Sequence, residues 1–293
     1  MRAFLLSTGA ALLAVATPAL AQDAAAPGDI PAPVQGPVTP EDDFGRNSIL
    51  IGVGAAIVPT YEGSDSSRVV PVPQVRASIN GYTLSTRGTK LLLDIVPNDP
   101  GPVWDYQFGP AVSLNFSRNG NPDDERVDLL GRRKIAVELG GYVGIGKTGV
   151  ITSDYDKLSA SVVFVQDVSG VNKSFSLSPQ IDYSTPLSRK AFVGISGSLT
   201  YAGDGFADTY FGVTREGALR SGLPGFNPDA DWKNWSVSAY AAYSLTGDLL
   251  GGLQLVGGVS YSRLLNDFAR SPIVSIAGDR NQWFYALGLG YSF

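Results

Sequence analysis

The sequence predicts a closed antiparallel transmembrane β-barrel of about twelve strands, with ten as the alternative count. Three observations support this fold class: side chains that alternate with a period of two residues, aromatic residues repeated at one distance, and a hydrophobic content of 44% without long apolar runs. Barrel strands turn their apolar face to lipid and their small or polar face to the lumen. A membrane-spanning helix would need about 18 consecutive apolar residues, which no segment after residue 21 offers.

The alternation is clearest in the last strand, which ends at Phe293. Bulky residues alternate there with small or polar ones, so one face of the strand is apolar and the other carries small or polar side chains. The same period recurs in residues 104–117, 175–183 and 235–244. Because the strand ends with aromatic side chains on its lipid face, we expect Tyr291 and Phe293 to form a signal for assembly into the membrane.

Aromatic residues recur eight positions apart on the predicted outer faces, as in Trp235 and Tyr243. Eight residues at roughly 3.3 Å each, tilted by about 40°, rise about 20 Å, close to the apolar band between the two aromatic girdles of outer-membrane barrels. The predicted girdle residues are Trp104, Phe116, Phe175, Tyr183, Trp235, Tyr243, Trp283 and Tyr285.

The N-terminal region predicts export. Residues 1–21 have the pattern of a signal peptide, with Arg2, an apolar stretch and a small-x-small site that predicts cleavage near Ala21. Residues 22–46 are rich in Pro and Ala and carry few large apolar side chains, so they cannot fold alone and are expected to form a periplasmic tether. Residues 47–293 form the predicted barrel, which we expect in the outer membrane of a Gram-negative cell.

The strand count follows from parity. Both termini of bacterial barrels normally face the periplasm, which requires an even number of strands, and eleven strands are apparent. A split of Tyr82–Val96 at Arg87-Gly88-Thr89 supplies the twelfth, and residues 203–233 become a long outer loop. Proline cannot donate to a ladder, so prolines inside the predicted strands are expected at bulges or local breaks in pairing. These prolines are Pro71, Pro73, Pro110 and Pro179.

The composition excludes several kinds of chemistry. The chain has neither His nor Cys, which excludes Ser-His-Asp and Cys-His catalysis and any disulfide framework. A net charge of −5 argues against a nucleic-acid partner. Residues 141–148 match the phosphate-loop pattern G-x-x-x-x-G-K-T, but they continue a strand and no helical period follows. We therefore expect no catalytic residue, no cofactor and no metal site.

Four charged residues fall on predicted lumen faces: Arg76, Asp105, Glu138 and Asp182. A charge inside a barrel must be solvated or paired. Two interpretations stay open. The residues either form a polar network that braces the wall, or they line a constriction that selects solutes.

Several short motifs resemble the MipA/OmpV family in the same order. They are Pro59-Thr60-Tyr61-Glu62-Gly63-Ser64-Asp65, Asp208-Thr209-Tyr210-Phe211-Gly212-Val213-Thr214, Ser221-Gly222-Leu223-Pro224, Tyr261-Ser262-Arg263-Leu264-Leu265 with Ser271-Pro272-Ile273-Val274, and the segment from Asn281 to Phe293. The resemblance extends from about Asn47 to Phe293, so the proline-rich tether falls outside it. It implies an outer-membrane barrel with a scaffolding role, which brings together a lytic transglycosylase and a bifunctional peptidoglycan synthase. Other members are porin-like or adhesive, and the family has no catalytic residues to carry over.

The sequence therefore predicts a non-enzymatic outer-membrane barrel that acts as a scaffold in cell-wall assembly. Its expected partners are outer-membrane lipid, a lytic transglycosylase and a peptidoglycan synthase. A small-solute channel is the first alternative, and a surface adhesin that uses residues 203–233 is the second.

Overall fold

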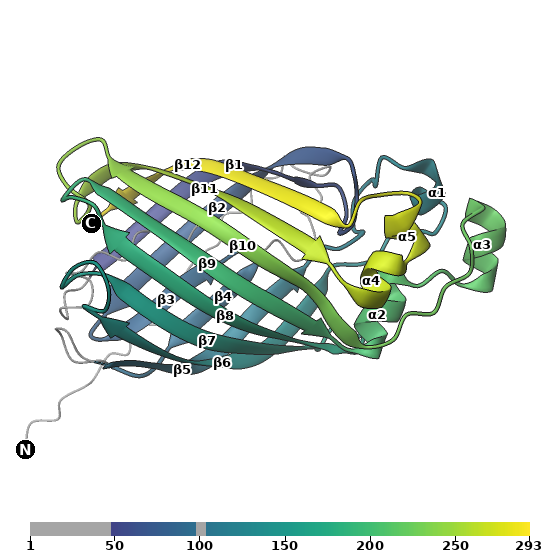
Figure 1. The fold of residues 1–293 in the computed structure, drawn as a ribbon, viewed down its shortest axis with the longest axis horizontal. Coiled ribbons are helices and arrows are strands. Elements are labelled where there is room, and N and C mark those ends of the chain that lie inside the picture. Colours follow the sequence, from purple (N-terminus) through teal and green to yellow (C-terminus); the bar gives the residue numbers. More distant parts are fainter. Residues whose placement is uncertain (1–47, 98–103) are drawn as a thin grey trace, which may run out of the picture.

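The computed structural model describes residues 48–97 and 104–293, and these residues form one closed antiparallel barrel. Twelve strands follow one another around the wall in chain order, and the last strand closes on the first (Figure 1). The predicted fold class and strand number are thus confirmed. The predicted signal peptide and tether lie outside the described residues. In the part of the chain that the structure covers, none of the helices combines the length and the apolar character needed to cross a membrane.

The strands are β1 (Ser48–Pro59), β2 (Ser67–Ile79), β3 (Tyr82–Arg87), β4 (Lys90–Asp94), β5 (Trp104–Asn115), β6 (Ala136–Thr148), β7 (Lys157–Asp167), β8 (Phe175–Pro186), β9 (Ala191–Ala202), β10 (Asp231–Ser244), β11 (Gly252–Leu264) and β12 (Asn281–Ser292). Five short helices lie in the loops between them: α1 (Glu125–Asp128), α2 (Asp204–Phe211), α3 (Arg215–Ser221), α4 (Asn266–Arg270) and α5 (Pro272–Ser275).

Side-chain exposure alternates along the strands as the sequence predicts. In β5 the outward Trp104 and Phe108 are 53% and 55% exposed, whereas the inward Ala111 and Ser113 are each 1% exposed. The outward side chains are apolar or aromatic and the inward ones are small or polar, which is the arrangement that a barrel surrounded by lipid requires.

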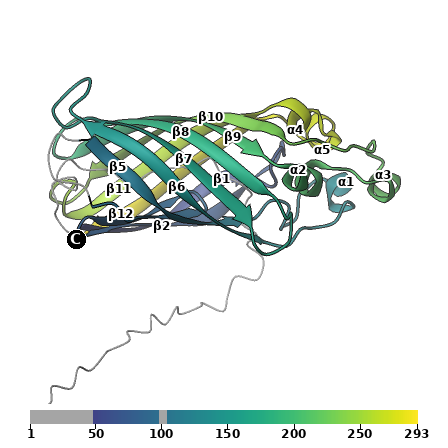
Figure 2. The same cartoon turned by 90° about the horizontal axis from the view of Figure 1, so that it is seen from below.

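The two ends of the barrel differ. At one end the connections include tight turns, such as Asn80-Gly81 between β2 and β3, where both residues have positive φ (53° and 85°), as a two-residue type I′ hairpin turn requires. All five helices lie at the opposite end, away from the C-terminus (Figures 1 and 2). Short periplasmic turns and longer outer loops are typical of bacterial barrels, so we call these the inner and the outer end.

The predicted division of residues 82–96 is confirmed. β3 ends at Arg87, β4 begins at Lys90, and Gly88 has a φ of 60° in the turn between them. Glycine at the first central position is typical of a type II′ turn. The β3–β4 hairpin is therefore short, because its two strands have only 6 and 5 residues.

The prolines of β2 lie on an edge without a partner strand. The backbone N–H and C=O of Val75 both bond to the hydroxyl of Thr86, so Val75 directs these groups toward β3. Backbone groups two residues apart in a strand point the same way, so the nitrogens of Pro71 and Pro73 also point toward β3. Only residues Arg76–Ile79 of β2 pair with β3 in the described part of the chain. The missing N–H groups thus cost no hydrogen bond there.

The other two prolines also coincide with interruptions in pairing. Pro110 lies next to the place where the ladder between β4 and β5 stops, at the pair Leu92 and Ala111. Pro179 lies in β8 where the ladder with β9 omits two residues of β8, between Leu177 and Gln180. The prediction of local breaks at the strand prolines is confirmed, and the physical reason is the missing donor.

The orientation of the barrel can be tested by labelling this Cys-free chain. A Cys in place of Asp229, which is exposed in the outer loop before β10, is expected to react with a membrane-impermeant maleimide on intact cells. A Cys in place of Arg189, whose side chain is 87% exposed in the β8–β9 turn, should react only after the outer membrane is permeabilised. If intact cells label the Arg189→Cys variant and not the Asp229→Cys variant, the assigned ends are wrong.

We propose that Tyr291 and Phe293 form the assembly signal. Their rings lie 4.8 Å apart between centroids, both side chains point outward, and the Phe293 N–H donates to Ile49 O (2.9 Å). Deletion of Phe293 removes this bond and an exposed aromatic ring, so the folded, heat-modifiable fraction in outer membranes is expected to fall. Deletion of Leu219, which is 82% exposed on α3, is the control and should leave the folded fraction unchanged.

Candidate functional site: a charged lumen under a packed cap

The structure places all four predicted lumen charges on the inner face of the barrel. Asp105 of β5 forms an ion pair with Lys157 of β7, with 2.7 Å between Oδ2 and Nζ. The side-chain amide of Gln107 donates to the same carboxylate oxygen at 2.7 Å. Since β5 and β7 are separated by β6, this ion pair ties together strands that share no ladder.

Two further carboxylates have partners close by. Glu138 is 4% exposed and accepts a hydrogen bond from the amide of Asn115 at 3.3 Å. Asp182 is 5% exposed and accepts one from the amide of Gln180 at 2.6 Å. These contacts are what the interpretation as a bracing network expects, because each carboxylate has a donor held by the wall itself.

The basic side of the lumen comes from β2 and β3. Arg87 of β3 donates from Nη1 to the hydroxyl of Ser161 on β7 at 3.2 Å, although these strands are not neighbours in the sheet. Arg76 also faces the lumen, and its buried Nε has no hydrogen-bond partner within residues 48–97 and 104–293. Sequence reasoning missed Arg87 and Lys157. Alternation from Thr83 and Ser85 places Arg87 on the lumen face. The prediction from the sequence instead puts Arg87 in the turn at Arg87-Gly88-Thr89.

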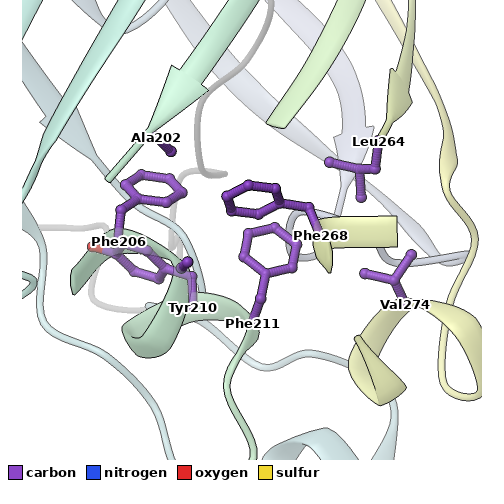
Figure 3. Packing of buried hydrophobic residues seen from close by; sticks show 8 residues of the cluster. Ala202, Phe206, Tyr210, Phe211, Leu264, Phe268 and Val274 are labelled. Atoms are coloured by element: carbon purple, nitrogen blue, oxygen red, sulfur yellow. The ribbon is translucent and has the colours of Figure 1, made fainter. Parts of the chain in front are cut away.

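Apolar side chains from the outer loops form a cap at the outer end. Phe206 and Phe211 of α2 pack against Phe268 of α4, and these three rings are at most 1% exposed (Figure 3). The rings of Phe211 and Phe268 meet edge to face with centroids 5.0 Å apart. Tyr61, Val213 and Ile273 belong to a second buried cluster, so loops from four parts of the chain share one small core. We call these two clusters the cap.

A buried ion pair joins the cap to the wall. The register of β10 shifts between Trp232 and Asn234, and this bulge turns Lys233 inward next to the inward-facing Asn234. Lys233 Nζ lies 2.7 Å from Glu62 Oε1, in the β1–β2 loop, and 4.7 Å from the centre of the Phe206 ring. The Lys233 side chain is only 1% exposed, so removal of either partner leaves a buried charge without its counterion.

Two polar side chains tie the loops of the cap together. The Tyr61 hydroxyl donates to Ala277 O at 2.5 Å, and burial, together with Asp124 and Asp65, raises the pKa of this phenol above its ordinary value. Arg118 donates to Tyr210 O and Gly131 O at 3.3 and 3.2 Å. Burial and the nearby Arg133 lower the pKa of Arg118 to about 9. Both groups therefore stay proton donors at neutral pH.

The predicted girdle residues lie on the outer face or next to it. Trp104, Phe175, Tyr243, Trp283 and Tyr285 are between 36% and 53% exposed. Tyr183 and Trp235 are half-buried, and Phe116 follows directly after the end of β5. Lys147 places its ammonium 5.4 Å from the centre of the Trp104 ring, as expected for a lysine near a membrane interface. Their role as a girdle stays a prediction.

The remaining sequence motifs form no site in the structure. Residues 141–148 lie within β6, so the pattern that resembles a phosphate loop is strand backbone and not a loop before a helix. Among the residues that the structure describes, no group of three or more Asp or Glu side chains comes together as a metal site would require.

The fold and the lumen define a class of protein. A closed twelve-stranded barrel with an apolar outer face, a polar lumen and a packed outer end is an outer-membrane β-barrel. Within this class, residues 51–293 match the family described as MltA-interacting protein MipA. Since the match covers most of the chain, the protein belongs to this family. The family and the fold are those of a non-enzymatic barrel.

Individual relatives align over a short segment. The MltA-interacting proteins of Escherichia coli (strain K12) and Shigella flexneri are each 37% identical over 65 residues. The aligned segment is 22% of this chain and 24% of each relative.

Two solved outer-membrane proteins align with most of the chain. An outer membrane channel from Pseudomonas putida F1 aligns with a TM-score of 0.42 and 12% identity, over 85% of this chain and 96% of the channel. An anion-selective porin from Comamonas acidovorans aligns with a TM-score of 0.38 and 10% identity, over 85% of this chain and 99% of the porin.

The ion pair between Glu62 and Lys233 is expected to stabilise the cap. Lys233→Met leaves the Glu62 carboxylate buried without its ammonium partner, so the free energy of unfolding should fall by about 3–5 kcal/mol. The double variant Glu62→Gln/Lys233→Met should recover most of this loss, because no charge remains buried. The measurement is denaturant unfolding in detergent, combined with protease cleavage of the outer loops.

Arg220→Met is the matched control for this prediction. It removes an exposed i,i+4 pair with Glu216 at 3.7 Å and should change stability by less than about 1 kcal/mol. Equal stability of Lys233→Met and Arg220→Met would show that the buried pair contributes nothing beyond a surface pair.

Proposed function

We propose that the protein is a non-enzymatic scaffold that holds a lytic transglycosylase at the periplasmic face of the outer membrane. Family membership supports this role, because the relatives are described as proteins that interact with MltA. The packed cap supports it as well, since the rings of Phe206, Phe211 and Phe268 are buried among the outer loops, at the end away from the periplasm. A peptidoglycan synthase is the proposed second partner.

The observation that carries the proposal is a rigid apolar loop at the inner end, residues 149–156 between β6 and β7. Ile151 and Tyr155 are 66% and 53% exposed on this loop. Exposed apolar side chains on a structured loop are typical of protein contact sites, because they lose little conformational entropy on binding.

One carboxylate holds this loop in shape. Asp156 is fully buried and accepts hydrogen bonds from the backbone N–H groups of Val150 and Ile151 and from the Tyr183 hydroxyl, at 2.5, 2.8 and 2.9 Å. Burial alone would raise the pKa of this carboxyl, but these donors and the Thr152 N–H hold the pKa well below its usual range. The loop is thus preorganised at every pH of the periplasm.

Binding of a lytic transglycosylase tests the proposal. The full chain, folded in detergent or nanodiscs, is expected to bind a lytic transglycosylase of the same cell envelope. Ile151→Asp with Tyr155→Asp should weaken binding at least tenfold, which about 1.4 kcal/mol of lost contact energy would produce. Removal of residues 22–46, the predicted tether, should also weaken binding if the tether contributes a second contact.

Leu219→Asp is the control, because Leu219 is 82% exposed but lies on α3 at the outer end. Binding that is unchanged by the loop substitutions, or lost equally with Leu219→Asp, would contradict the assignment of the inner loop. Failure of the wild-type chain to bind the enzyme at all would contradict the scaffold.

The charged lumen favours a second candidate, a small-solute channel. Arg76, Arg87, Asp105 and Asp182 all face the lumen, and charged side chains that line a lumen can select ions. Conductance can be measured in planar bilayers. A change in ion selectivity on neutralising Arg76, Asp105, Glu138 and Asp182 would support the channel. A barrel with a stable cap is expected to show no steady conductance.

A further inference from the structure

The barrel wall has a gap in its outer half, next to β2. Other neighbouring strands pair close to their outer ends, as Pro59 does with Ser67 and Asn115 with Ala136, although the ladder between β1 and β12 stops at Ile57 and Tyr285. The β3–β4 hairpin stops at Gly88, and within the described residues the edge of β2 from Ser67 to Pro73 has no ladder partner on this side. Seven residues at roughly 3.3 Å each make this edge about 23 Å long.

The gap is framed on its other sides. The end of β5 reaches the hairpin turn, where the Leu114 N–H donates to Thr89 O at 3.2 Å. The chain after β5 then crosses above the gap toward the β1–β2 loop, where the Thr60 hydroxyl donates to Pro122 O at 2.9 Å. The result is a window, which we define by the β2 edge, the hairpin turn, the end of β5 and residues 116–122.

A small cavity of about 40 Å³ reaches the place where the hairpin meets the β2 edge. Its lining includes Val72, Pro73 and Gln74 of β2 and Thr86 and Gly88 of the hairpin, and it continues across β1, β12 and one residue of β11. Pro73 and Gly88 would be opposite each other if the β2–β3 register continued, since Arg76 pairs with Ser85. The cavity therefore marks the lower corner of the window.

The β2 side of the window is apolar on both faces of the wall between Val69 and Val72. On the outer face Val69 and Leu114 are 69% and 40% exposed, so the window opens to the hydrocarbon of the outer leaflet. On the lumen side Val70 belongs to a buried cluster with Val58 and Phe284. A polar solute would lose its hydration between these surfaces, whereas a hydrocarbon chain would lose nothing.

Arg68 adds a charge at the outer end of the window. It is the second residue of β2 and lies on the lumen side, and its Nε and Nη2 are buried without a hydrogen-bond partner in the described residues. The Asp123 carboxylate lies near enough to attract the Arg68 charge, but it makes no hydrogen bond to Nε or Nη2. Two buried guanidinium donors without acceptors are costly, and a phosphate is an acceptor that fits their fork geometry.

We propose that the window binds a phosphorylated lipid of the outer leaflet, with one acyl chain between the β2 edge and the hairpin and the phosphate on Arg68. The lipid is the occupant because the window opens into the leaflet that holds acyl chains, and its anionic end lies where the two guanidinium donors lack an acceptor. A second protein strand is disfavoured on this edge, because Pro71 and Pro73 cannot donate to it.

Photocrosslinking in outer-membrane vesicles tests the position of the chain. A benzoylphenylalanine in place of Val72 is expected to form lipid adducts that mass spectrometry identifies. The same residue in place of Val163, which faces the lumen from β7 with strands paired on both sides, should form none. A disulfide made by Pro73→Cys/Gly88→Cys should abolish the adducts, and reduction should restore them. Equal adduct yields at positions 72 and 163, with or without the disulfide, would contradict the proposal that a lipid chain lies in the window.

Native mass spectrometry tests the phosphate. The wild-type chain should retain phosphatidic acid at least about tenfold better than diacylglycerol with the same acyl chains, as a charge-assisted hydrogen bond provides. Arg68→Gln should remove this preference, and Arg68→Lys should keep part of it. Retention of both lipids that is independent of Arg68 would overturn the phosphate site. Displacement of phosphatidic acid by millimolar inorganic phosphate would show an anion site only and would equally overturn the lipid assignment.

Discussion

The need to pair every backbone N–H and C=O in hydrocarbon determines the architecture of this protein. Lipid offers no hydrogen-bond partner, so a sheet in the membrane must close on itself. The ladder between β1 and β12, which runs from Leu50 with Ser292 to Ile57 with Tyr285, completes the closure. The alternation of apolar and polar side chains follows from that closure, because every strand then has one face toward lipid and one toward the lumen.

The same constraint explains the prolines, which looked like exceptions in the sequence. A strand edge without a partner would expose N–H groups to hydrocarbon, at a cost of several kcal/mol for each group. Pro71 and Pro73 have no N–H, and their nitrogens lie on the long edge of β2 that has no ladder partner in the described residues. The prolines thus remove two of the N–H groups that the short β3–β4 hairpin would leave without a partner, and they also protect the edge against pairing with another chain.

The sequence predicted the wall well because a period of two residues is a local property. Eleven of the strands and the lumen positions of Arg76, Asp105, Glu138 and Asp182 follow from it, and the requirement for an even number of strands adds the division at Arg87-Gly88-Thr89. The helices of the cap were not predicted, because α2 has eight residues and the others are shorter, too few to show a helical period. Lys233 was not recognised either. Its inward direction comes from a bulge and its partner Glu62 lies far away in sequence, so no local pattern reveals the pair.

The partners of the lumen charges could not be predicted for a related reason. The closed wall brings Asp105 to Lys157 and Arg87 to Ser161 across strands that share no ladder. Such contacts depend on the curvature of the barrel, which alternation alone does not determine. One of them also anchors the short hairpin. Arg87 is the last residue of β3 and reaches β7, so the hairpin is anchored through the lumen where it lacks a complete ladder in the sheet.

The two ends and the wall together limit what this barrel can exchange with its surroundings. Packed rings at the outer end oppose passage along the axis, because opening would expose Phe206, Phe211 and Phe268 and separate the buried pair of Glu62 and Lys233. A lipid at the β2 edge would need no such opening, because Val69 and Leu114 already face the outside of the barrel. The proposed lipid therefore approaches from the outer leaflet, while the loop held by Asp156 lies at the inner end, where the protein partner is proposed to bind.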